Sequence, residues 1–386
     1  MLQTAPHAAG CLRDIDAVAR RHATWFTSLA EAADAQLRTP AERAGHDRIE
    51  ARLDELRAAH RWARSHDALL AARLTAALQL HAHTRLWNEP AQWAAELSLV
   101  LDPGDPMAAH VWAAMANAAA HEGRLADGVD LAERALDTGD SRATAVALEA
   151  LADIMMYEGD LARCGALARR LREVGERSGD RHAVALGHVD LALALTYAAD
   201  PASGLELLAG LDRIGLAPSD LAWVHYAEGE ALAFEDPRAA LAAFDRGIDL
   251  ADRVGNRFLG GVARVSASSV TARSGDAERA LPAFVRIIED WRRQGNRTHL
   301  VILLRNLVEL LVRIGANDPA AMLLGALESA ELKATYGQEA QTIAAARATL
   351  EARVGAHHLQ RSMARGHGKD VLWAADVAIQ TIRELP

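Results

Sequence analysis

The sequence predicts an all-α protein built as a solenoid of antiparallel helix pairs. Five glycines follow one another at steps of 40, 36, 40 and 40 residues: Gly139, Gly179, Gly215, Gly255 and Gly295. Aspartates with the same spacing each open a stretch rich in alanine and leucine, namely Asp160, Asp200, Asp236 and Asp276. A repeat of this length is typical of stacked helix pairs, in which each repeat buries its apolar face only against its neighbours.

The composition fits such a fold and argues against several classes of protein. Half of the residues are apolar (51%) but only 4% are aromatic, so alanine and leucine, both strong helix formers, must supply the core. The net charge of −10 argues against direct binding of nucleic acid, which needs positive charge to neutralise phosphates. Cys11 and Cys164 lie far apart, and no apolar run approaches the ~20 residues that span a bilayer. We therefore expect a reduced, cytoplasmic protein without membrane contact.

Residues 1–66 are predicted to form a helical junction region ahead of the repeats. Two long helices are expected, over 15–37 and 41–66, separated by Thr39-Pro40. The first carries an apolar face that a self-contained scaffold would cover with polar residues. This predicted partner surface consists of Ile15, Val18, Trp25, Phe26 and Leu29.

Residues 67–330 are predicted to form the repeat solenoid, with residues 70–101 as an irregular first repeat. The periodic glycine ends one helix, because a helix C-terminus often adopts the left-handed conformation that glycine tolerates. The periodic aspartate is expected to cap the helix that follows, and Pro201 and Pro237 fit its first position. Asp318-Pro319 repeats this device two residues late. Residues 331–386 are expected to form a C-terminal helical cap, with helices over 338–354 and 369–382 joined by a loop over 355–368.

One stretch is similar to the tetratricopeptide repeat family. Its signature has a tryptophan and small residues on the first helix and alanines on the second, which match Trp112, Ala116, Ala119, Gly123, Gly128, Ala132 and Ala135. The period here is longer than the family's ~34 residues. The resemblance implies a right-handed superhelical solenoid in which the first helix of each pair lines the concave side.

The family's spacing places nine polar residues in the concave groove, while Trp112 and Trp223 are expected in the core. A helix side that must be buried would not carry the nine, although any solenoid also has a solvated inner surface. The groove contains no lysine, so the resemblance does not support a lysine clamp on a peptide carboxylate. The candidate binding residues are His110, Asn117, Glu149, Asp153, Tyr157, His225, Ser269, Arg305 and Glu309.

A second resemblance covers most of the chain. The runs 20–33 (RRHATWFTSLAEAA) and 53–63 (LDELRAAHRWA) resemble the junction after the winged-helix domain of bacterial STAND-type regulators, and 320–328 (AAMLLGALE) resembles the segment that closes their repeat arm. That family includes AfsR-like and LuxR-type activators and cyclase-linked ATPases. Their nucleotide-binding core and DNA-binding helix-turn-helix are missing from this sequence, so the resemblance implies either the sensor arm alone or a fragment of a longer reading frame.

The sequence offers no recognisable catalytic, cofactor or metal site. The stretch 366–370 (GHGKD) comes nearest to a phosphate-binding loop, but it lacks a glycine and has Asp370 in place of the hydroxyl residue, so Asp370 is predicted to cap the last helix. His121-Glu122 lacks the second histidine of a zinc motif, and Cys164 occupies a small-residue packing position. We therefore expect no cofactor and no enzyme, since catalysis would need a polar constellation that the sequence does not reveal.

Together these observations predict a non-catalytic ligand- or protein-binding repeat arm of a bacterial signal-transducing or transcription-regulating protein. The expected partners are a protein or peptide, possibly a small effector, and the nucleotide-binding half of the regulator in cis or in trans. The alternative is a free-standing scaffold or adaptor of the same fold, which would bring proteins together without such a half.

Overall fold

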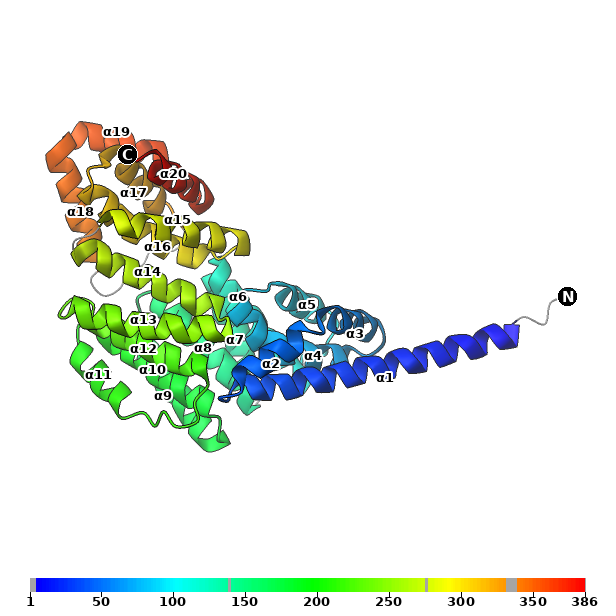
Figure 1. The fold of residues 1–386 in the computed structure, drawn as a ribbon. Helices are drawn as coiled ribbons and strands as arrows, with labels where there is room; N and C mark the ends of the chain where they lie inside the picture. Colours follow the sequence, from blue (N-terminus) through cyan, green and yellow to red (C-terminus); the bar gives the residue numbers. More distant parts are fainter. Residues whose placement is uncertain (1–4, 138–139, 275–276, 331–338, 386) are drawn as a thin grey trace.

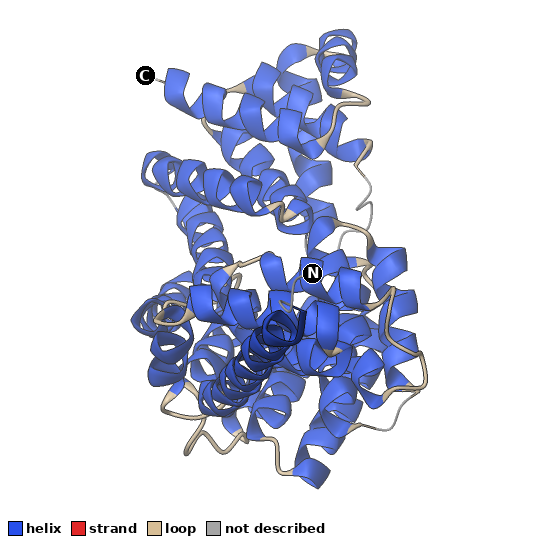
Figure 2. Cartoon of the chain, turned by 90° about the vertical axis from the view of Figure 1, so that its right-hand side faces the viewer, coloured by secondary structure: helices blue, strands red, loops and turns tan. Residues whose placement is uncertain are grey.

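The computed structural model describes residues 5–137, 140–274, 277–330 and 339–385. Within these ranges it contains twenty helices and no strand (Figure 2), which confirms the all-α prediction. Successive antiparallel pairs stack into a right-handed superhelical solenoid (Figure 1). The pairs are α4 (Ala68–Arg85) with α5 (Glu89–Leu97), α6 (Pro106–Glu122) with α7 (Leu125–Leu136), α8 (Ser141–Tyr157) with α9 (Leu161–Ser178), α10 (Arg181–Tyr197) with α11 (Pro201–Ala209), α12 (Pro218–Leu232) with α13 (Pro237–Val254), α14 (Arg257–Ser274) with α15 (Ala277–Gln294) and α16 (Arg297–Arg313) with α17 (Asn317–Glu328).

Three helices precede the pairs. The N-terminal part of α1 (Ala5–Leu37) extends away from the body of the molecule (Figure 1). The single helix expected over 41–66 is wrong, because the chain turns at Ala51 and Arg52 between α2 (Glu42–Glu50) and α3 (Leu53–His66). This turn lets both short helices pack against α1.

Most of the periodic glycines and aspartates in the described ranges have the predicted backbone roles, but Gly215 does not end a helix, because α11 ends at Ala209 and Gly215 lies in the loop before α12. Gly179 and Gly255 end α9 and α13 in the left-handed conformation, with φ values of +74° and +72°. Asp160, Asp200 and Asp236 each accept a hydrogen bond from a backbone N–H in the first turn of the helix that follows. Gly139 and Asp276 lie outside the described residues.

Asp318 does not cap a helix, which corrects the sequence prediction. The N-cap of α17 is Ala316, and Asp318 lies inside the first turn. Its carboxylate faces α19 (Ala356–Gly366), where it accepts hydrogen bonds from His358 Nε2 at 2.5 Å and from Ser362 Oγ at 2.9 Å. Asp318 therefore ties the solenoid to its C-terminal end.

The loop expected over 355–368 is also wrong, because most of it forms α19. The other C-terminal helices are α18 (Glu339–Val354) and α20 (Val371–Glu384). A Cβ atom at Gly325 or Gly366 would lie within 2.0 Å of a backbone oxygen of the facing helix, so both glycines permit a close crossing of α17 and α19. Asp370 caps α20 by accepting from the N–H of Trp373 at 2.9 Å, as predicted.

The superhelix closes on itself. Helices α2, α4 and α6 contact α13, α14 and α16, which follow much later in the sequence. Polar side chains bond backbone carbonyls across this junction: Asn88 Nδ2 donates to Gln294 O at 3.0 Å, and Thr298 Oγ1 donates to Ala120 O at 2.5 Å. The two halves of the superhelix therefore meet beside the concave surface and narrow it to a partly open cavity, whereas the sequence suggested an open groove. No helix of the described ranges is long and apolar enough to cross a membrane.

Candidate binding cavity

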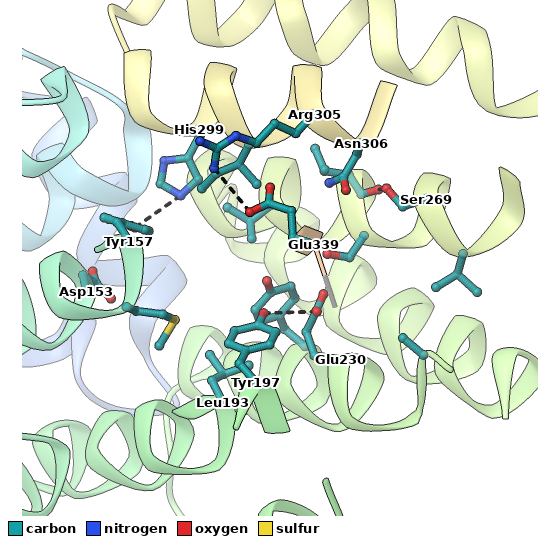
Figure 3. Close-up of a pocket in the computed structure, with 18 of the residues that line it drawn as sticks. Asp153, Tyr157, Leu193, Tyr197, Glu230, Ser269, His299, Arg305, Asn306 and Glu339 are labelled. Carbon is teal, nitrogen blue, oxygen red and sulfur yellow. Dashed lines mark hydrogen bonds and ion pairs between the residues drawn. The ribbon is translucent and has the colours of Figure 1, made fainter. Parts of the chain in front are cut away.

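The concave surface contains a partly open cavity of about 170 Å³. Its walls come from α8, α10, α12, α14 and α16, which are the first helices of five successive pairs, and α18 covers one side (Figure 3). One wall helix from each repeat is the arrangement that the repeat spacing predicted. The volume leaves room for on the order of ten water molecules, enough for part of a peptide or for a small molecule.

Six of the nine predicted groove residues line this cavity: Glu149, Asp153, Tyr157, Ser269, Arg305 and Glu309. The other three lie outside its lining. Asn117 borders a neighbouring hollow between α4 and α6 and accepts a hydrogen bond from His83 Nδ1 at 3.1 Å. His110 Nε2 lies 3.3 Å from Asp140, and His225 donates from Nδ1 to Glu228 at 2.8 Å, so both histidines pair with neighbouring carboxylates.

The sequence prediction missed one row of lining residues. Asp190, Tyr226, Ser266 and Asn306 all line the cavity, and their steps of 36, 40 and 40 repeat those of Gly179, Gly215, Gly255 and Gly295. Two of them stand one residue after a predicted residue, since Tyr226 follows His225 and Asn306 follows Arg305. Tyr197, 40 residues after Tyr157, was also missed. Extending the glycine period to every position of the first helices would have found all five.

One side of the cavity is acidic. Glu149 and Asp153 lie on successive turns of α8, and Asp190 lies on the neighbouring α10. Burial, together with the charge of Glu149, raises the pKa of Asp153 to about 8, and burial with the charges of Asp153 and Glu149 raises the pKa of Asp190 well above its usual value. Burial also raises the pKa of Glu149. In the empty cavity this side therefore holds protonated carboxyl groups near neutral pH.

Other parts of the cavity lining carry paired polar groups (Figure 3). Arg305 lies 3.3 Å from Glu339 at the start of α18, and Tyr197 Oη donates to Glu230 at 3.1 Å. Arg305 is only 4% exposed, which corrects the expectation that this arginine lies on a solvated groove surface. Burial raises the pKa of Glu230 and of Glu309.

A cluster of histidine and aromatic rings lies where the superhelix closes. The rings of His83, His121 and His299 surround Phe258, with centroids 4.5, 5.0 and 5.0 Å from it. His299 Nδ1 donates to Asn296 at 2.9 Å, so its Nε2 can accept the 3.4 Å bond from Tyr157. Burial lowers the pKa of His83 to about 4 and that of His299 to about 3, so both rings are neutral at pH 7.

Two observations on the described part of the chain concern metal binding and thiol reactivity. Within it, no group of three or more His, Cys, Asp or Glu side chains could hold a metal ion. Cys164 is fully buried, and burial raises the pKa of its thiol, which disfavours the reactive thiolate. Trp112 lies in the core as predicted, whereas Trp223 is only partly buried and lines the cavity.

No protein-family model and no curated protein matches the chain. Among solved structures, the chain is similar to a Rap protein complexed with competence and sporulation factor, with a TM-score of 0.52 and 14% sequence identity. The similarity covers 96% of this chain and 98% of that one. At this identity the likeness establishes a shared helical-repeat fold, and the function must be argued from the cavity itself.

Proposed function

We propose that this chain is a non-catalytic binding protein that takes up a short peptide in its inner cavity. One observation carries the proposal: five successive repeats each contribute a helix to one cavity, and their polar side chains project into it (Figure 3). A structure of similar fold, the Rap protein, was determined in complex with competence and sporulation factor, which supports a ligand-binding role for such a superhelix.

The lining suits the chemistry of a peptide. Ser266, Ser269 and Asn306 offer hydroxyl and amide groups, which can both donate and accept hydrogen bonds as a peptide backbone requires. Trp223 and Phe258 add the apolar contact area that usually dominates a small-ligand pocket. The uncharged backbone of a peptide needs such mixed walls, whereas a purely apolar ligand would leave the polar groups without partners.

The position of the cavity gives binding a structural consequence. A ligand that touches α8 and α16 at once joins the first and last wall helices, which belong to repeats far apart in the sequence. Binding would therefore favour the closed form of the superhelix over more open forms and so transmit a signal to a partner. This is the role expected of a protein in signal transduction or transcription regulation.

A second candidate is the repeat arm of a larger regulator, and the surface of α1 favours it. Ile15, Val18 and Trp25 are 65%, 55% and 58% exposed, whereas Phe26 is 8% exposed and packs into the core. An apolar helix surface of this kind is suited to covering by another protein, here the nucleotide-binding half. A Trp25→Glu variant tests the candidate, which predicts that a reporter response in the host cell is lost while peptide binding in the cavity persists.

The test of the proposed function is affinity selection from a pool of random pentapeptides. Wild-type protein should retain a subset of the pool, and Ser269→Trp, which fills the cavity, should reduce retention by roughly tenfold or more, the effect of one lost well-made contact. Ala126→Trp is the matched control, because it adds the same side chain to an exposed position on α7. Retention of no peptide by the wild type, or equal retention by Ser269→Trp, would contradict the proposal.

A further inference from the structure

The acidic side of the cavity contains a buried oxygen atom without a partner. Asp190 is only 6% exposed, and its Oδ2 has no hydrogen-bond partner among the described residues. Neither Glu149 nor Asp153 forms a hydrogen bond or an ion pair within that part of the chain. A buried polar atom left unpaired is destabilising, so an acceptor held in a cavity wall points to a donor that arrives with a ligand.

The positive groups nearest to these carboxyls already have partners. His182 Nδ1 lies 2.6 Å from Asp220, and Arg38 lies 3.8 Å from Asp180 and 3.9 Å from Asp34. The thiol of Cys164 faces the group from α9, and it is protonated because burial raises its pKa. Ionisation of all three carboxyls would therefore leave negative charge that no neighbouring side chain balances.

The walls beside the carboxyls are aromatic. Tyr197, Trp223, Tyr226 and Phe258 line the same cavity, and aromatic faces together with carboxylates form the environment that binds guanidinium and ammonium groups. A bare metal ion would need a tighter set of oxygen ligands than the described residues provide. The lining thus favours an organic cation.

We propose that Glu149, Asp153 and Asp190 form a subsite for an organic cation, a guanidinium or alkylammonium group. The proposal rests on the proposed function, since the group is carried by the bound peptide as a basic side chain or a free N-terminus. The same chemistry could also come from a free small amine, and the experiment below separates these sources.

Binding of a cation at this subsite is linked to proton release. Before a ligand binds, Asp153 and Asp190 hold protons because they are buried beside other carboxyl groups, with Asp153 at a pKa of about 8, and burial also raises the pKa of Glu149. An arriving cation stabilises the ionised form, so a proton leaves to solvent as the ion pair forms. The affinity for the cationic ligand therefore rises as pH increases to about 8. The affinity for a ligand that accepts hydrogen bonds from protonated carboxyls would instead fall as pH increases over the same range.

Three probes test the subsite. Two are pools of amidated random pentapeptides, one with free N-termini and one with acetylated N-termini, and the third is agmatine, a free amine. Wild-type protein should either enrich peptides with arginine or lysine from the acetylated pool, or retain peptides with a free N-terminus better than acetylated ones. Either preference should be roughly tenfold, the effect of one charge-assisted contact. Asp190→Asn and Asp153→Asn should abolish this preference, with folding checked by circular dichroism. Asp245→Asn, which changes an exposed carboxylate on α13, should keep it.

The outcomes distinguish the two proposals. Peptides retained without preference for a cation, or with a preference that survives Asp190→Asn, overturn the subsite and leave the proposed function intact. Agmatine bound in an Asp190-dependent manner with no peptide retained supports the subsite and overturns the peptide assignment. If the protein binds neither peptide nor amine, both proposals are overturned. For any retained cationic ligand, calorimetry in phosphate and in Tris should show proton release, and its absence counts against the subsite.

Discussion

Glu42 and Ser219 join the two halves of the superhelix across 177 residues of sequence. The Glu42 carboxylate accepts hydrogen bonds from the backbone N–H of Ser219 at 2.8 Å and from its hydroxyl at 2.5 Å. Asn256 Nδ2 donates to the same hydroxyl at 2.9 Å. Because Ser219 lies in the first turn of α12, a carboxylate from α2 satisfies the free N-terminus of a distant helix. This contact helps to close the superhelix around the cavity.

Glu42→Ala should therefore lower stability markedly. The substitution leaves the buried N–H and hydroxyl of Ser219 without their acceptor, at a cost of about 1–3 kcal/mol. Thermal unfolding followed by circular dichroism measures the effect. Glu31→Ala is the matched control, because Glu31 forms an exposed ion pair with Arg73 whose loss should cost less than ~1 kcal/mol. Equal shifts in the two variants would mean that Glu42 does not hold the closure.

Asp236→Ala tests the repeat boundary. Asp236 accepts a hydrogen bond from the N–H of Ala239 at 3.0 Å as the N-cap of α13, so its loss should cost about 1 kcal/mol. The same melting experiment measures it, with Asp249→Ala on the exposed side of α13 as the control. A melting curve that coincides with that of the wild type would show that the cap contributes nothing.

The pH dependence of stability should reveal the protonated carboxyl of Asp153. In the folded chain its pKa is about 8, and in the unfolded chain it is ~3.9, so between these values only the folded state keeps the proton. The contribution of Asp153 to the stability of the wild type therefore falls as pH rises from 5 to 8. The free energy of unfolding of Asp153→Asn should rise relative to that of the wild type over this range, as melting curves at each pH would show. The rise should be less than ~1.4 kcal/mol per pH unit, the value for one full proton, because solvent reaches the group. A constant difference between the two proteins would contradict the raised pKa.

The parts of the fold that follow from local chemistry could be predicted from the sequence. Gly179 and Asp236 act on the helix ends beside them, so their positions alone indicate where helices stop and start. The closure could not be predicted, because Glu42 finds its partner 177 residues away. Helix α19 was missed because Gly366 normally breaks helices, whereas here it permits close packing against α17.

The candidate site was predictable to a similar degree. The repeat spacing indicated the correct wall helices, because every first helix repeats the same orientation. It missed Tyr226 and Asn306 because it chose the residues just before them, and one residue along a helix turns a side chain by ~100°. It named no residue of α10, so it also missed Asp190. It also treated Arg305 as solvated, since nothing in its own repeat indicates that α18 covers it.

Arg305→Met should loosen α18. Arg305 is the buried partner of Glu339 at the first residue of that helix, so the substitution leaves a partly buried carboxylate without its cation. Hydrogen exchange of the first turns of α18 should become faster, because local opening requires less free energy. Arg347→Met is the control, since Arg347 lies on the same helix in an exposed pair with Glu328. Unchanged exchange in Arg305→Met would show that the pair does not hold α18 in place.

Hydrogen exchange measured with and without a retained peptide tests most directly the claim that the inner cavity is the recognition surface. The account predicts slower exchange in α8, α10, α12, α14 and α16, unchanged exchange in the outer helices α9 and α13, and no effect of the peptide on Ser269→Trp. Slower exchange confined to α1 or to the outer helices, or a full response in Ser269→Trp, would contradict it.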